Sequence, residues 1–455
     1  MRSIRLGSGS GMWPDRSDAA IEIIEKGNVG YISFDTMAEM TLPGMQKLRF
    51  DDPEKGYTDI RRTANDIMPH CVLNKVGLIS NCGGANPMSA GKIAIDVANK
   101  LGLHGTRIAT VSGDDTTGEE CLARIKELKS KGISLDHLDT GEKLESIEDR
   151  IIAMSVYLGA EPIAEALEQG AQIVITGRHT DSAMWLAPAC YEFGWALTDW
   201  DRLAAAVIVG HLAECSGHIT GGNFSFWQEV PDPAHLGFPI VEVYENGEAI
   251  ITKVEGSGGV VSEATCKEQL LYELHDPANY MTPDVVANVT GLKFEQVGKD
   301  RVKLSGIKGK PRPATLKACI GYRDGYVGQA FAFYAWPRAV AKARRAEEIL
   351  RGRFQMMGIE ADEIRFDYIG VNSLHGSLSP EPEVELNEVG LRVAVKSPEE
   401  SNVMKVIRDI YALDLSGPAA QTGVFHLPPR EMIAMWPTLI PREEIQHEMM
   451  VTEIP

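Results

Sequence analysis

The sequence predicts an α/β protein whose N-terminal domain is an open, mostly parallel sheet with helices on both faces, followed by a C-terminal α+β domain. Three observations lead to this fold class. At 455 residues the chain is too long for a single hydrophobic core. In the first ~225 residues, short apolar strands alternate with helix-like stretches, which implies parallel pairing through crossovers. After residue 239 the texture changes to hairpins mixed with strand–helix units.

The N-terminal elements follow in order along the chain. Short runs rich in β-branched and aromatic residues predict strands, and each strand leads into a loop of glycine and polar residues. Amphipathic stretches between them predict helices, two of which end at a glycine, Gly27 or Gly102. The expected strands lie within 3–11, 29–35, 75–87, 107–118 and 171–181, and the expected helices within 18–27, 89–102 and 161–170.

The proline-rich segment 231–239, PDPAHLGFP, is the predicted domain boundary, which divides the chain into residues 1–230 and 240–455. The dipeptide Asn246-Gly247 between two apolar runs predicts a β-hairpin. Beyond it we expect helices within 257–274 and 337–354 and strands within 327–336 and 362–371, with a strand followed by a helix over 391–413.

Charge and composition exclude several classes of protein. The formal net charge of −19 disfavours binding to nucleic-acid phosphates. The apolar run 203–213 is too short for a membrane span, which needs roughly 20 residues, so it predicts a core helix. The N-terminus has no secretion signal and the seven cysteines form no CxxC pair, so we expect a cytoplasmic protein with reduced thiols.

Polar, glycine-rich loops follow nearly every strand of the predicted parallel sheet. In an open parallel sheet the carboxyl ends of the strands share one edge, and ligands bind in the crevice there. Glycines let backbone amides approach a ligand. The sequence therefore predicts a ligand site at this edge, formed by the loops 7–11, 34–39, 81–87, 112–118 and 176–182.

Each loop by itself allows more than one interpretation. The GSGSG segment lacks the third glycine of a dinucleotide fingerprint, and no phosphate-binding P-loop motif occurs. The NCGGANP segment is either an amide cradle for an anion or a turn that caps the next helix. The predicted substrate-binding residues of these loops are Ser8, Gly9, Ser10, Glu39, Asn81, Gly83, Gly84 and Asn86.

Acidic residues in the loops are candidates for proton transfer. Asp35 follows the second strand, and the adjacent Asp114 and Asp115 either take part in catalysis or cap a helix. Arg178 and Asp181 follow a buried strand; they predict an anion clamp and an acid or base, with a structural ion pair as the alternative.

The stretch 210–224, GHLAECSGHITGGNF, places His211 and Glu214 three residues apart on one helical face. They are either an acid–base pair at the crevice or a buried structural pair. Zinc on His211, Cys215 and His218 is a further alternative, whereas a Cys215 nucleophile is disfavoured at a helix C-terminus. The following turn contributes Thr220, Gly221 and Gly222 as predicted substrate-binding residues.

Two features of the second half are weaker candidates. Lys253 and Gly258 belong to a glycine turn before a helix N-terminus, and we include both among the predicted substrate-binding residues. The helix within 337–354 carries six Lys and Arg residues and is either a solvated face or a surface for coenzyme phosphates or an acidic partner.

The chain resembles the acyclic terpene utilisation A (AtuA-like) family. The resemblance rests on IRLGSGSGMWPDR, FDTMAEMT, NCGGANP, YLGAEPIAEALEQGAQIVITGR, HITGGNF and EQLLYE, among other segments between residues 4 and about 285. It implies the breakdown of citronellol-type and geraniol-type compounds through acyl-CoA thioesters, and for some relatives a small companion protein. It implies no catalytic residues.

Together these observations predict an enzyme of carboxylic acid or acyl-CoA catabolism, a hydratase or other lyase for an unsaturated or hydroxy acyl substrate. Coenzyme A would enter as part of the substrate, in a homo-oligomer that binds neither nucleic acid nor membrane. Two alternatives stay open: a nucleotide- or divalent-metal-dependent enzyme, with Asp114 and Asp115 on Mg²⁺, and a non-catalytic subunit that needs a small partner protein.

Overall fold

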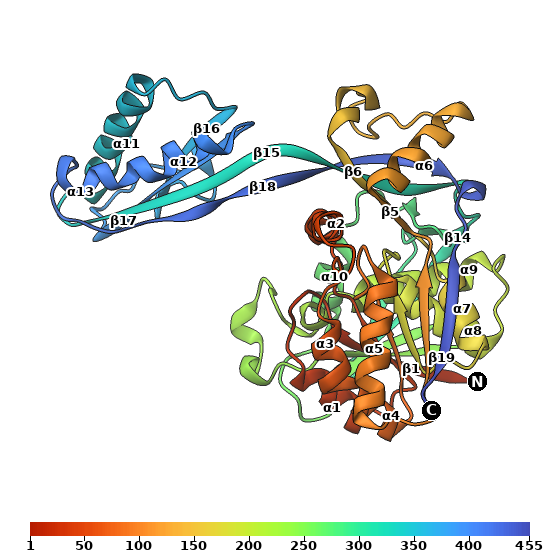
Figure 1. The fold of residues 1–455 in the computed structure, drawn as a ribbon. Helices are drawn as coiled ribbons and strands as arrows, with labels where there is room; N and C mark the ends of the chain where they lie inside the picture. Colours follow the sequence, from red (N-terminus) through yellow and green to blue (C-terminus); the bar gives the residue numbers. More distant parts are fainter. The chain divides into compact units, whose positions relative to one another are not determined.

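The computed structural model describes residues 1–455 and divides them into two compact units, residues 1–321 with 435–455 and residues 322–434 (Figure 1). This division differs from the predicted boundary at 231–239. Strand β8 (Pro239–Tyr244), which follows that segment, pairs antiparallel with β1 (Ser3–Ser10) and so extends the N-terminal sheet. The proline-rich segment is therefore a loop within the first unit.

The centre of the first unit is a parallel sheet, which confirms the predicted α/β class. Five strands pair in parallel in the order β1, β2, β3, β7, β4. Apart from β1, they span Tyr31–Phe34 (β2), Gly77–Ser80 (β3), Ile173–Thr176 (β7) and Arg107–Ser112 (β4). All of them lie in segments where the sequence predicts strands.

Antiparallel strands extend this parallel centre on both sides, so the complete ten-stranded sheet is mixed. Beyond β1 lie β8, β9 (Ala249–Lys253), β13 (Arg301–Ser305) and β12 (Lys293–Gly298), and beyond β4 lies β19 (Glu448–Glu453). The predicted hairpin at Asn246-Gly247 is confirmed as the β8–β9 connection, where Gly247 adopts a positive φ of 87°. Short hairpins connect β8 to β9 and β12 to β13, and such connections favour antiparallel pairing.

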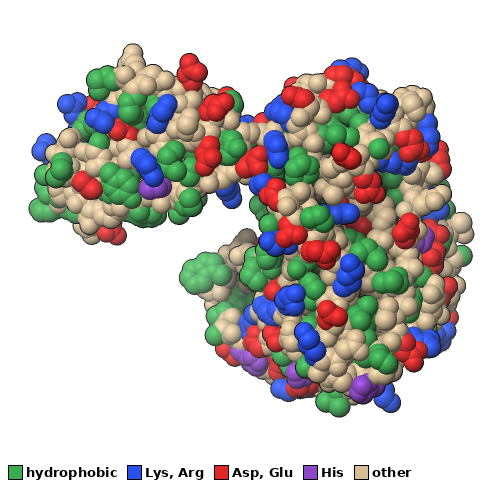
Figure 2. All heavy atoms as spheres, viewed as in Figure 1, with side chains coloured by type: hydrophobic (Ala, Val, Ile, Leu, Met, Phe, Trp, Pro, Cys, Tyr) green, Lys and Arg blue, Asp and Glu red, His purple; other side chains and the backbone are tan.

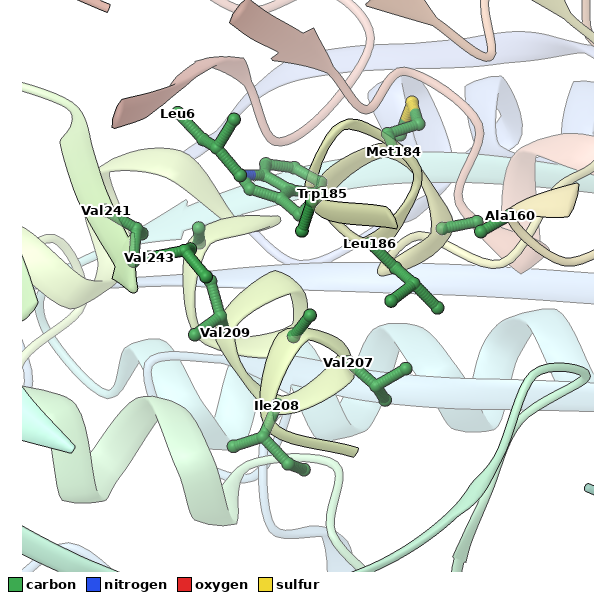
Figure 3. Packing of buried hydrophobic residues seen from close by; sticks show 14 of the residues in the cluster. Leu6, Ala160, Met184, Trp185, Leu186, Val207, Ile208, Val209, Val241 and Val243 are labelled. Carbon is green, nitrogen blue, oxygen red and sulfur yellow. The ribbon is translucent and has the colours of Figure 1, made fainter. Parts of the chain in front are cut away.

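Helices cover both faces of the sheet, as predicted (Figure 1). Residues that are adjacent on β7 point to opposite faces. Ile173 and Ile175 pack in one core with α1 (Asp18–Lys26), α4 (Met68–Asn74) and α5 (Pro87–Leu101). Val174 packs in the other with α7 (Glu161–Glu168), α8 (Ala183–Phe193) and α9 (Trp200–Ala213). Figure 3 shows residues of the second core.

The apolar run 203–213 lies within α9 and is buried throughout. It is a core helix, as the sequence predicts. None of the helices has the length and apolarity that would let it cross a lipid bilayer.

The first unit contains further short elements around the sheet edge. Strands β5 (Asp115–Thr117) and β6 (Ile151–Val156) join the first residues of β15 (Thr315–Ala335), and β10 (Tyr280–Met281), β11 (Val286–Asn288) and β14 (Lys308–Lys310) form a small separate sheet. The helices here are α2 (Leu42–Asp51), α3 (Ile60–Arg62), α6 (Gly118–Ser130) and α10 (Glu263–Leu271).

The second unit is an α+β domain, in agreement with the class predicted for the C-terminal half. Strands β16 (Glu363–Ile369) and β17 (Glu388–Ser397) pair antiparallel with each other and with β15, and β18 (Gln421–Pro441) also pairs with β15. Helices α11 (Ala339–Met356) and α12 (Glu400–Asp409) pack on this sheet, and α13 (Leu413–Ser416) follows them.

The basic helix of the prediction is α11, and acidic groups accompany its cations. Arg344, Arg345, Arg351 and Arg353 form ion pairs with Glu381, Glu348, Glu347 and Asp409, respectively. Figure 2 shows basic and acidic side chains interspersed over the visible surface. The helix therefore presents a mixed surface rather than a uniformly basic one.

Candidate functional site

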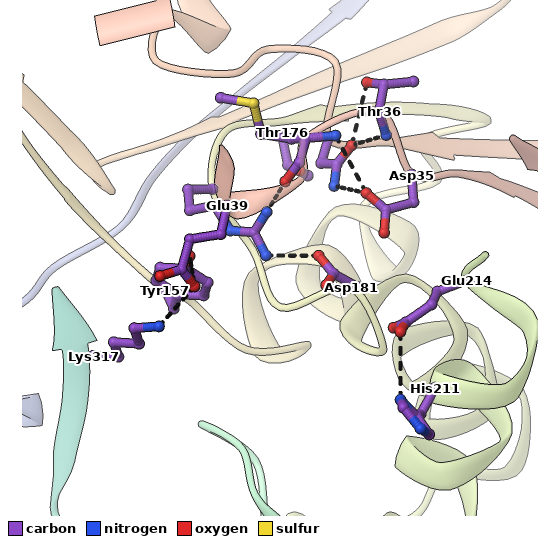
Figure 4. Close-up of polar contacts among 12 residues, drawn as sticks. Asp35, Thr36, Glu39, Tyr157, Thr176, Asp181, His211, Glu214 and Lys317 are labelled. Atoms are coloured by element: carbon purple, nitrogen blue, oxygen red, sulfur yellow. Dashed lines mark hydrogen bonds and ion pairs between the residues drawn. The ribbon is translucent and has the colours of Figure 1, made fainter. Parts of the chain in front are cut away.

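Three carboxyl groups meet at the predicted edge of the parallel sheet. Asp35 follows β2, Asp181 follows β7, and Glu214 is the C-terminal cap residue of α9. One carboxyl oxygen from each residue lies within 4.8 Å of the other two (Figure 4). The structure thus brings together side chains that the sequence places 146 and 33 residues apart.

Asp35 is buried and is held by hydrogen bonds from its neighbours. Its Oδ1 accepts a hydrogen bond of 2.7 Å from Asn81 Nδ2, and Asn81 Oδ1 in turn accepts one of 2.8 Å from the backbone N–H of Thr36. Burial, reinforced by the nearby charge of Asp181, raises the pKa of Asp35 well above its ordinary value. Burial therefore favours the protonated form of Asp35 over the carboxylate.

His211 and Glu214 form a buried pair. Nε2–H of His211 donates to the backbone oxygen of Leu270 at 3.0 Å, and Nδ1 lies 3.3 Å from Glu214 Oε1. Burial raises the pKa of Glu214 to about 7. Burial also lowers the pKa of His211, but the hydrogen bond and the charge of Glu214 outweigh it and the net shift is upward. An imidazole and a carboxyl group at this distance can exchange a proton, as an acid–base pair does.

Arg178 anchors the loop after β7 and is almost completely buried, with 2% of its surface exposed. Its Nη2 donates to Asp181 at 2.6 Å, its Nη1 donates to the backbone oxygen of Met37, and its guanidinium lies 4.3 Å from the ring centroid of Tyr157. Nε of Arg178 and Oγ1 of the nearby Thr180 have no protein partner. These groups are suited to a substrate oxygen.

Glu39 belongs to a second charged group beside Arg178. Its Oε2 accepts hydrogen bonds from the Tyr157 hydroxyl at 2.9 Å and from Lys317 Nζ at 2.6 Å. Lys317 Nζ also lies 5.2 Å from the centroid of the Tyr157 ring. Sequence reasoning found Glu39 but missed Tyr157 and Lys317, because nothing in the residues next to either one indicates a contact with Glu39.

A cavity of about 390 Å³ in the first unit opens onto these groups. One part of its wall is apolar and the other part is polar, and the polar part includes Asp181 and Glu214. Such a cavity is large enough for a small organic substrate. The apolar side chains are Leu138, Tyr280, Met281, Pro283, Pro313, Leu316 and Leu439, and the other polar ones include Tyr157, Arg178, Thr180, Ser182 and Lys317.

The charges at the polar end balance without an additional ion. Asp181 is matched by Arg178, and Glu39 by Lys317. Glu214 faces the imidazole of His211. The carboxyl spacing is compatible with a divalent cation. However, a cation there would compete with Arg178 for Asp181 and with His211 for Glu214.

Removal of divalent metal is therefore expected to leave the protein unchanged. After dialysis against EDTA, the chain should contain on the order of 0.1 or fewer divalent ions and should retain its melting temperature, because Arg178 and His211 already contact the carboxyls of Asp181 and Glu214. Elemental analysis and a thermal melt check this result. A retained stoichiometric ion, or a melting temperature that falls on chelation, would contradict it.

Asp114 and Asp115 lie outside this cluster. Asp115 forms an ion pair with Arg49 and accepts a hydrogen bond from Ser155, and Asp114 Oδ2 accepts one of 2.5 Å from the backbone N–H of Arg178. Asp115 is the first residue of β5, so the pair belongs to the packing of β5 rather than to a free polar loop. In the metal alternative these two carboxylates bind Mg²⁺. In the structure both of them have protein partners instead.

Burial raises the pKa of Asp114 to about 6. A carboxyl whose pKa is higher in the folded than in the unfolded chain stabilises the fold at low pH, and this contribution disappears as the pH rises through the folded pKa. Between pH 4 and pH 7, the wild-type chain should lose about 2–3 kcal/mol more unfolding free energy than Asp114→Asn. Urea unfolding at pH 4 and at pH 7 measures this loss of unfolding free energy. An equal loss in the wild-type chain and in Asp114→Asn would refute the raised pKa of Asp114.

The predicted cradle residues of the first half mostly serve the packing of the backbone. A Cβ on Gly9 would lie 2.4 Å from the Phe34 ring, and one on Gly83 would lie 2.4 Å from the backbone oxygen of Thr176. Asn86 caps α5 through the N–H of Ser89 at 3.3 Å. Three further residues are buried or lie in a turn: Ser8 and Ser10 are buried in β1, and Gly84 has a positive φ of 58°.

The predicted binding residues of the later loops also serve the packing of the backbone. Thr220 Oγ1 donates to Gly237 O at 2.6 Å, and a Cβ on Gly221 or Gly222 would crowd Val230 or Gly217 O. Lys253 donates to Ser257 O at 2.6 Å, and a Cβ on Gly258 would lie 2.0 Å from Asp232 O. Lys253 and Gly258 line a different cavity, away from the carboxyl cluster.

The zinc alternative finds no support in the geometry. Cys215 Sγ lies 2.9 Å from the Tyr272 hydroxyl, and His218 Nε2 lies 2.6 Å from Asn223 Nδ2. Neither residue belongs to a group of three metal-ligating side chains with close donor atoms. All seven cysteines are free thiols.

The fold and the cavity together define an α/β protein with a cavity at the carboxyl ends of its parallel strands. The model of the acyclic terpene utilisation family protein AtuA matches residues 4–451, so the chain belongs to this family. The resemblance stated from the sequence is thereby confirmed and extends through the second unit. Comparisons with curated proteins and with solved structures give no match.

Proposed function

We propose that this protein is an enzyme of carboxylic acid or acyl-CoA catabolism, a hydro-lyase for an unsaturated or hydroxy acyl substrate of the acyclic terpene type or a related small acid. The observation that carries the proposal is a mostly apolar cavity that opens onto a cluster of carboxyl groups and a histidine. Asp181 and Glu214 line this cavity, and Asp35 and His211 back them. The family description supports the substrate class.

The charge balance favours an uncharged reacting group. Because each cation at the polar end already has its carboxylate, a free carboxylate would bring an unmatched charge into a buried region. A thioester carbonyl brings none. Its oxygen can accept from Nε of Arg178 and from the Thr180 hydroxyl, the donors that lack a protein partner. The branched acyl chain then contacts the apolar wall.

Hydration of a conjugated thioester requires two proton transfers. In the proposed step, the Glu214–His211 pair takes a proton from water while the water oxygen bonds to the β carbon. The Asp35–Asp181 pair delivers a proton to the α carbon, and the enolate charge that develops on the thioester oxygen is stabilised by Arg178. Water is added across one double bond, and the reverse reaction releases it.

A thermal-shift panel tests the substrate class. A ligand that binds only the folded chain raises its melting temperature by mass action. We expect a rise with branched enoyl-CoA thioesters that exceeds the rise with the matching free acids or with free coenzyme A. A rise only with NAD(H), or only with ATP and Mg²⁺, would contradict the proposal and favour a nucleotide-dependent enzyme. No rise with any ligand would favour a subunit that needs its companion protein.

A further inference from the structure

The acid–base pair is held from one side by a single turn of α10. Gln269 Nε2 donates to the backbone oxygen of His211 at 3.1 Å, and His211 Nε2–H donates to the backbone oxygen of Leu270 at 3.0 Å. The Tyr272 hydroxyl donates to Glu214 Oε1 at 3.1 Å. Three residues within one turn thus contact both members of the pair, and none of them was predicted from the sequence.

The ring of Tyr272 stacks on the imidazole of His211. The ring centroids are 5.7 Å apart and the planes differ by 8°. This contact fixes the plane of the imidazole, and the hydrogen bond to Leu270 fixes its rotation. Nδ1 is therefore directed at Glu214, as Figure 4 shows.

Cys215 determines the direction in which the Tyr272 hydroxyl donates. Its Sγ lies 2.9 Å from the hydroxyl oxygen. Burial raises the pKa of the Cys215 thiol to about 12, so the sulfur keeps its proton and can donate to the tyrosine oxygen. The single phenolic proton is then free to point at Glu214 Oε1. The hydrogen bonds run from Cys215 to Tyr272 and on to Glu214.

We propose that Tyr272 is a positioning residue that holds Glu214 as the carboxylate and leaves a proton on Nδ1 of His211. A donor on Oε1 stabilises the charged carboxylate relative to the acid, so Glu214 becomes the base of the pair. The catalytic consequence rests on the proposed hydro-lyase function, whereas the position of the proton does not. The other titratable groups that face Glu214 are Asp35, Asp181, Cys215, Glu273 and Tyr280.

The variant Tyr272→Phe keeps the ring stacked on His211 and removes only the donor. In ¹⁵N NMR of the full-length protein at pH 7, we expect the His211 Nδ1 resonance to move toward the position of an unprotonated ring nitrogen. Tyr191→Phe, which changes an exposed tyrosine, should leave it in place. This readout needs no substrate, so it stands even if the hydro-lyase assignment fails. An unchanged Nδ1 resonance in Tyr272→Phe overturns the proposal.

A second substitution tests the same proposal if Tyr272→Phe does not fold. Site-specific 3-fluorotyrosine at position 272 is nearly isosteric with tyrosine and is a stronger donor, so it should move the Nδ1 resonance in the opposite direction. With turnover established, Tyr272→Phe should lower kcat about 10-fold and change KM less than about twofold. A purely structural role predicts the same resonance position in all folded variants, and that result would refute the proposal.

Discussion

Glu214→Gln is expected to reduce kcat/KM by about 10³-fold without unfolding the chain, since general acid–base groups contribute between about 10² and 10⁴. The amide fills the volume of the carboxyl, and it still accepts from Tyr272. It does not exchange a proton with substrate water. The steady-state rate with an acyl thioester and the melting temperature together measure the effect.

A matched control shows whether the loss of any carboxylate lowers activity or only the loss of Glu214. Glu168→Gln removes a carboxylate from the exposed C-terminal residue of α7, outside the cavity, and should retain full activity. If Glu214→Gln keeps more than about a tenth of the wild-type kcat/KM, Glu214 is not the general base, because that loss is smaller than such a group supplies.

Arg178→Met should lower the free energy of unfolding by about 2 kcal/mol. Removal of one partner of a buried ion pair leaves the other charge unpaired, and the typical cost of 3–5 kcal/mol is reduced here because the Asp181 side chain is 30% exposed. The substitution also removes the donor to Met37 O. Urea unfolding at neutral pH measures the change.

The double variant Arg178→Met with Asp181→Asn supplies the control. If the unpaired charge causes the loss, neutralising Asp181 should restore part of the unfolding free energy. If the double variant is no more stable than Arg178→Met alone, the lost unfolding free energy comes from packing and not from the unpaired charge. Arg178→Lys keeps the charge but lacks Nε–H, and it should lower kcat/KM about 100-fold, as loss of an oxyanion donor does.

The parallel centre of the sheet was predictable because its signal is local. Each of the five centre strands, β1, β2, β3, β4 and β7, is a short apolar run followed by glycine or polar residues, and helix-like stretches lie between them. The domain boundary was not predictable in the same way. Proline and glycine at 231–239 mark a loop, but whether the following hairpin starts a new core depends on the pairing of β8 with β1, a contact across more than 200 residues.

The residues of the candidate site likewise divide into those with a local sequence signal and those without one. The sequence indicated Asp35, Arg178 and Asp181 because they lie in loops that follow strands. It indicated His211 and Glu214 because they are three residues apart on one helix. Tyr157, Lys317 and Tyr272 could not, since their roles depend on contacts with distant parts of the chain. Asp114 and Asp115 follow a strand as well, but β5 pairs with β6 and turns them toward Arg49 and the Arg178 backbone.

A hydro-lyase of the proposed kind adds water to a conjugated acyl thioester in the cavity. This activity can be measured by incubating the purified chain with a branched enoyl-CoA and following the ultraviolet absorbance of the conjugated thioester together with the mass of the product. We expect loss of that absorbance, a product heavier by one water, and neither change with Glu214→Gln. A folded chain that leaves the absorbance unchanged and yet is stabilised by the same thioester would contradict the proposed function.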